Sequence, residues 1–168
     1  MKRIVSVFLL ISILIGIFSG CAISVENGEF TTGLEGAVLT INKELKDNGL
    51  QELPMPEKSA GQTAQINYSL GDIEIILIAG ELTGCLKKVM FLNNTLEYTA
   101  YAAGSNERML DYARCFIKVL DSKADVDKIA ETLEFQNVDE SGVRNASTEH
   151  CKYSLSGGSG ARLTIEAK

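Results

Sequence analysis

The chain has 168 residues, of which 45% are hydrophobic and 23% charged, the balance of an ordinary globular protein. A chain of this length is about the size of one domain and can bury a core without metals or a dense set of disulfides. The net charge of −6 argues against a nucleic-acid partner, because phosphate binding draws on clustered Lys and Arg side chains.

The first segment has the layout of an export signal. Lys2 and Arg3 precede an apolar stretch over residues 4–18, which is shorter than the ~20 residues needed to span a ~30 Å hydrocarbon core. Small residues follow this stretch, where a retained membrane helix would have a basic stop-transfer cluster. We therefore expect residues 1–20 to be a cleaved signal peptide, and loss of its two basic residues would change the net charge from −6 to −8.

The end of this segment, Phe18-Ser19-Gly20-Cys21, resembles the bacterial lipobox, with Phe18 where Leu is usual. The resemblance implies cleavage before Cys21, acylation of its thiol with palmitate-type chains, and attachment to the extracytoplasmic face of the cell membrane. Two acyl chains would hold the protein there, since each buried CH₂ contributes ~0.8 kcal/mol. Ala22 at the next position would permit sorting to the outer membrane in a Gram-negative cell.

Beyond the signal, we expect a lipidated cysteine with a short tether over residues 21–31 and a single globular domain over residues 32–168. The domain resembles the small extracytoplasmic lipoproteins of Firmicutes-like bacteria. That resemblance implies a membrane-anchored location and no particular active site.

In the first half of the domain, the apolar spacing over residues 34–45 predicts an amphipathic helix. Thr32 and Glu35 have the spacing of a capping box, and Asn48-Gly49 supplies a stop. Alternation over residues 65–70 and apolar runs over 73–79 and 86–92 predict three strands. Because the links between them are short, the three strands should form an antiparallel meander.

In the second half, the pattern predicts a long helix from Leu96 to Leu120 and a short one beginning at Asp125. Residues 136–147 are polar and turn-rich and should be mobile, and strands over 151–155 and 162–166 should form a terminal hairpin. The order helix, three strands, two helices, two strands predicts an α+β two-layer sandwich. Its antiparallel sheet should have about five strands, with helices packed on one face.

Three cysteines follow Cys21, namely Cys85, Cys115 and Cys151. Cys85 and Cys151 both lie in predicted strands, so they are the pair we expect to be bridged if a disulfide forms. The alternative is that all three are buried thiols acting as small hydrophobes. No Cys-x-x-Cys pair is present, and we expect neither a metal site nor a cofactor.

The only histidine lies in the sequence Glu149-His150-Cys151. Adjacent residues of a strand project to opposite faces, so His150 and Cys151 should not share a proton, although Cys115 could still meet His150 in space. The loop Gly157-Gly158-Ser159-Gly160 lacks the Lys-Ser/Thr and the helix start of a phosphate-binding loop, so a hairpin loop is the better interpretation.

These observations favour a non-enzymatic, membrane-anchored module that binds a protein or a cell-envelope partner. Two alternatives stay open. One is a small envelope hydrolase that uses Cys115 or Cys151 with His150, and the other is a capture lipoprotein that holds a small ligand in a cleft between sheet and helices.

Overall fold

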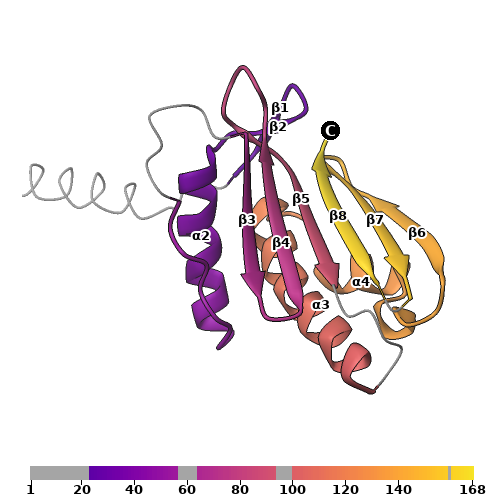
Figure 1. The fold of residues 1–168 in the computed structure, drawn as a ribbon. Helices are drawn as coiled ribbons and strands as arrows, with labels where there is room; N and C mark the ends of the chain where they lie inside the picture. Colours follow the sequence, from indigo (N-terminus) through magenta and orange to yellow (C-terminus); the bar gives the residue numbers. More distant parts are fainter. Residues whose placement is uncertain (1–22, 57–63, 94–99, 159) are drawn as a thin grey trace, which may run out of the picture.

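The fold was analysed in a computed structural model of the chain, which describes residues 23–56, 64–93, 100–158 and 160–168 (Figure 1). The expected signal peptide over residues 1–20 and Cys21 lie outside the described residues, as does the expected onset of the long helix at Leu96. The described helices are α2 (Leu34–Asp47), α3 (Ala100–Leu120) and α4 (Val126–Thr132). None of these helices is both long and apolar enough to cross a membrane.

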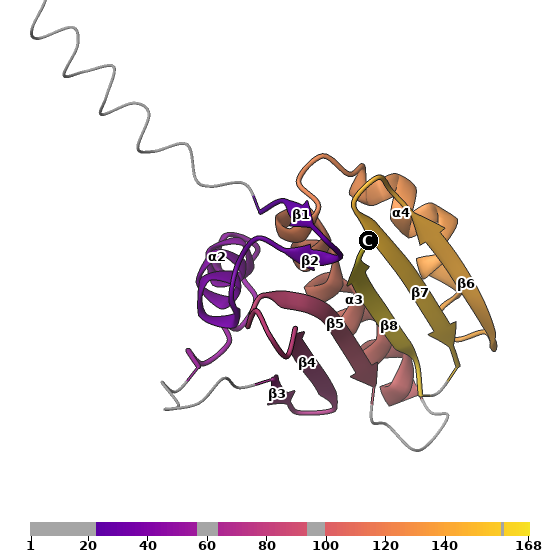
Figure 2. The same cartoon turned by 90° about the horizontal axis from the view of Figure 1, so that it is seen from above.

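One antiparallel sheet of six strands forms the second layer, in the order β3-β4-β5-β8-β7-β6. The prediction of an α+β two-layer sandwich is confirmed, with one strand more than the five expected. Figures 1 and 2 show the helices gathered on a single face of this sheet. The strand bounds are β3 (Gln65–Leu70), β4 (Ile73–Ala79), β5 (Leu86–Asn93), β6 (Gly142–Ser147), β7 (Cys151–Gly157) and β8 (Arg162–Ala167).

The additional strand is β6, at one edge of the sheet. The prediction that residues 136–147 are irregular and mobile was therefore wrong for 142–147. This edge strand is largely exposed on both faces, so its sequence carries no apolar alternation. Its regularity comes from complete pairing with β7, and Arg144 fixes it further by donating from Nε to Glu134 Oε2 at 2.7 Å.

The segment expected to be a tether contributes a short hairpin to the fold. Strands β1 (Val25–Glu26) and β2 (Glu29–Phe30) pair through Asn27 and Gly28, both at positive φ, as in the Asn-Gly turns that favour two-residue hairpins. Phe30 is fully buried. Residues 25–30, which we expected to lie in a tether, are therefore part of the described fold.

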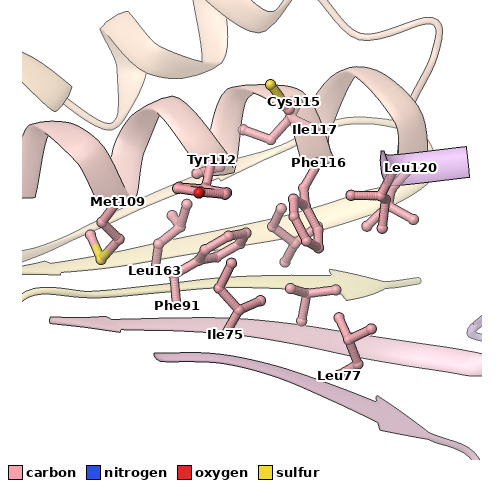
Figure 3. Close-up of a cluster of buried hydrophobic side chains, with 14 of the residues drawn as sticks. Ile75, Leu77, Phe91, Met109, Tyr112, Cys115, Phe116, Ile117, Leu120 and Leu163 are labelled. Atoms are coloured by element: carbon pink, nitrogen blue, oxygen red, sulfur yellow. The ribbon is translucent and has the colours of Figure 1, made fainter. Parts of the chain in front are cut away.

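The core lies between the helices and one face of the sheet (Figure 3). The ring of Phe116 in α3 meets the ring of Phe91 in β5 edge to face, with centroids 4.9 Å apart. Met109 in the middle of the same helix and Leu120 at its end are also buried against the sheet. Burial of each such side chain stabilises the fold by roughly 1.5–3 kcal/mol, so this layer holds α3 in place.

The helix ends follow the sequence signals in part. Asp125 caps α4 as predicted, because its carboxylate accepts a hydrogen bond from the Lys128 backbone N–H at 3.1 Å. The capping box expected at Thr32 is wrong, since Gly33 is the N-cap residue of α2 and no side chain caps that end.

Candidate functional site

The three described cysteines are free thiols. Cys85 immediately precedes β5 and Cys151 opens β7, and strand β8 lies between these two strands. Two inter-strand spacings separate the residues by about 10 Å. A disulfide needs Cα atoms within about 7 Å, so the structure does not bring together the pair that we expected to be bridged.

Cys115 lies on the side of α3 that faces away from the sheet (Figure 3). Burial, and then the negative charge of Glu44, raise the pKa of its thiol to about 11. Glu44 itself accepts a hydrogen bond from Lys118 Nζ at 2.6 Å and another from Asn48. Burial would raise the pKa of this carboxyl, but the hydrogen bonds from Lys118 and Asn48 outweigh burial and lower it.

Cys151 belongs to a buried polar cluster around Asp121, the residue that follows α3. The Asp121 carboxylate accepts hydrogen bonds from the Tyr153 hydroxyl at 2.8 Å and from Thr148 Oγ1 at 2.5 Å. Burial, and then the charge of Asp121, raise the pKa of the Cys151 thiol to about 12, and burial also raises the pKa of Tyr153. The cluster ties the end of α3 to the turn between β6 and β7.

His150 does not complete a catalytic pair with either thiol. Its side chain is partly exposed and lies 3.9 Å from the Glu149 carboxylate. No hydrogen bond joins His150 to Cys115 or Cys151 in the part of the chain that the structure describes. A thiol nucleophile needs a lowered pKa or an adjacent base, whereas burial raises the pKa of both thiols.

A second buried polar cluster, which the sequence did not reveal, lies at the opposite end of the sheet. Asn106 of α3 accepts a hydrogen bond from Asn93 Nδ2 at 2.6 Å and donates to Asp139 Oδ1 at 2.5 Å and, more weakly, to the Gly158 carbonyl at 3.4 Å. A Cβ added at Gly157 would lie only 2.2 Å from a backbone carbonyl oxygen. The lack of a side chain at Gly157 therefore permits close packing of the chain at this point.

The described helices leave the opposite face of the sheet uncovered, and we name it the open face. Register places side chains on it in cross-strand rows, one of which runs through Asn67, Ile76, Met90, Thr164, Ser154 and Asn145 from β3 to β6. On β4 and β5 the open face is apolar and half-buried, with Ile76 paired to Met90. No tyrosine with a described side chain is exposed on the open face, because Tyr68, Tyr112 and Tyr153 are all buried.

On β6, β7 and β8 the open face is polar and hollowed. A depression of about 590 Å³ lies there, lined mainly by hydroxyl, amide and charged side chains. The strand positions that pair across the open face, together with Lys168 after β8, carry four basic against two acidic side chains, and these are Lys88, Lys152, Arg162 and Lys168 against Glu74 and Glu166. We name the four basic residues the basic set.

The helix layer has the opposite charge. A groove of about 500 Å³ between α3 and α4 is lined by four acidic side chains and one arginine. Arg114 spans it, paired with Asp127 Oδ1 at 3.1 Å and stacked over the Phe135 ring at 5.5 Å. The acidic excess of the chain therefore lies on other parts of the molecule, and the open face is locally basic.

Among the described residues, no group of three or more His, Cys, Asp or Glu side chains is arranged to hold a metal ion. Comparisons with protein-family models, with curated proteins and with solved structures found no match to this chain. The geometry of its surfaces is therefore the basis for the functional proposal.

Proposed function

We propose that this protein is a lipid-anchored, extracytoplasmic binding module, held to the cell membrane through Cys21 and non-enzymatic in action. The lipobox-like sequence before Cys21 supports the anchor. The single observation that carries the binding role is the open face, where one side of a complete six-stranded sheet is left uncovered by the described helices (Figure 2). Sheets of this kind usually have one packed and one solvated face, so the open face is available to a partner.

The position of the hairpin β1–β2 adds to this proposal. In a chain cleaved before Cys21, only Cys21 and Ala22 would precede Ile23, and two residues span at most about 7 Å. An anchor at Cys21 would hold the hairpin end of the domain at the membrane surface.

The alternative of a Cys/His hydrolase receives no support from the geometry, because neither thiol contacts His150 in the described residues and burial raises both thiol pKa values. The other alternative places a captured ligand in a cleft between sheet and helices, and we propose a different location for such a ligand. The hollow on the open face is outside that interface, and it is large enough for a small ligand or one stretch of a polymer.

The anchor is tested by growing expressing cells with an alkyne analogue of palmitate and measuring both the label and the intact mass of the protein. The wild-type chain should carry label and begin at Cys21, and Cys21→Ala should carry none. Cys85→Ala is the matched control and should stay labelled, since it also removes one cysteine. An unlabelled wild-type protein, or label that persists in Cys21→Ala, would refute the anchor.

The binding surface is tested by placing a photo-crosslinking residue at Ser154, in the middle of the open face, and at Lys123, an exposed residue after α3. Irradiation of intact cells should give adducts at Ser154 and few at Lys123. Equal yields at the two positions would remove the open face as the binding surface.

A further inference from the structure

We infer that the basic half of the open face, on β6, β7 and β8, binds an acidic polysaccharide, a hydroxyl-rich chain with carboxylates spaced along it. The inference rests on the proposed role of the open face as a binding surface and names the partner that this face would take. It starts from the contrast between an acidic chain and a locally basic surface.

Two members of the basic set are free to meet a ligand. Lys88 is paired with Glu166 at 3.2 Å, and Lys168 donates from Nζ to the Thr148 carbonyl oxygen. Lys152 and Arg162 make no ion pair or side-chain hydrogen bond with any described residue, and both are exposed. Neither side chain has to leave an acidic partner before it can bind a ligand, so both charges are available.

The spacing of these two cations suits a polymer better than a single anion. Arg162 lies opposite Ser156 on β7, four residues from Lys152. Four residues along a strand and one strand across separate the two Cα atoms by about 14 Å. Successive charged units of an extended chain could each meet one of these cations without either side chain having to bend toward the other.

The side chains between the cations are hydroxyls and amides. Ser154 and Thr164 face each other across β7 and β8 in the intervening row, with Asn145 beside them on β6. Backbone N–H and C=O groups inside a sheet are already paired, so a ligand on this surface must be bound through side chains. Ser, Thr and Asn side chains both donate and accept, which matches the hydroxyl groups of a sugar chain.

Other polymers fit less well. Peptides recognised by sheets usually add to an edge strand through backbone hydrogen bonds, and this surface is a face. Single-stranded nucleic acids use aromatic stacking platforms, and no aromatic side chain projects from the described rows of the open face. A neutral glycan would leave Lys152 and Arg162 without a counter-charge.

The test uses the purified full-length protein in detergent and fluorescent polygalacturonate, with binding followed by fluorescence anisotropy. The double variant Lys152→Gln/Arg162→Gln should bind about twentyfold more weakly, since exposed ion pairs contribute up to about fivefold each. The matched control is Lys123→Gln/Lys128→Gln, which removes two exposed cations outside the open face and should bind as the wild type does. Binding should weaken when ionic strength rises from about 0.02 to about 0.3 M.

Uncharged dextran, polyglutamate and a single-stranded DNA oligomer serve as comparison ligands and should bind at least about tenfold more weakly than polygalacturonate. The inference is overturned by equal binding of any of these, by an unchanged affinity in the Lys152→Gln/Arg162→Gln variant, or by a dimer that forms through this face without ligand. If polygalacturonate fails to bind while crosslinks at Ser154 persist in cells, the ligand class is wrong and the proposed binding surface stands.

Discussion

The thiols of Cys115 and Cys151 should be almost inert in the folded protein. A pKa of about 11 leaves about one thiolate in 3,000 at pH 7.5, and a pKa of about 12 leaves about one in 30,000. An unperturbed cysteine at that pH is about one-tenth ionised. Ionisation alone should therefore slow alkylation roughly 300-fold at Cys115 and roughly 3,000-fold at Cys151, and burial slows it further.

The assay follows maleimide labelling by mass spectrometry at pH 7.5, first in buffer and then in denaturant. Only the half-buried Cys85 should react quickly in buffer, and Cys85→Ser should remove that fast phase. In denaturant the protein should show three reactive thiols, because acylation of Cys21 would remove one of the four cysteines in the sequence. Fast native labelling of Cys115 or Cys151 would refute the reasoning and revive the thiol hydrolase.

Four further substitutions test the packing and one ion pair. Gly157→Ala should destabilise the protein by about 2 kcal/mol, because the added Cβ would meet a backbone carbonyl oxygen. Gly104→Ala, where an added Cβ meets nothing, should stabilise α3 by about 0.5–1 kcal/mol. Urea unfolding measures both changes. Tyr153→Phe removes one donor to a buried carboxylate and should cost about 1–2 kcal/mol in the same assay. Lys118→Gln should lower the melting temperature at neutral pH. The difference should shrink as the pH falls below the ordinary range of a Glu carboxyl and through the lowered folded-state pKa of Glu44, because protonation of Glu44 removes the ion pair.

Much of the fold could be predicted because it is specified by local pattern. The run over residues 73–79 is apolar enough to predict a strand by itself, and Asp125 marks a helix start with its own side chain. The elements that were missed depend on partners elsewhere in the chain. Strand β6 is regular only because β7 pairs with it. The hairpin at Asn27-Gly28 was missed although Asn-Gly is a turn signal, because its two-residue strands are too short to show alternation.

The candidate surface shows why composition could not locate a binding site here. Lys87 and Lys88 are adjacent in sequence, and because a β-bulge breaks the alternation at the start of β5, both line one hollow in which Glu29, Glu81 and Glu166 balance their charge. Lys88, Lys152 and Arg162 are far apart in sequence, and they share a face because β8 lies between β5 and β7. A charged patch on a sheet depends on strand order and on alternate residues within each strand. The net charge of −6 is a property of the whole molecule, so it does not give the charge of any one of its faces.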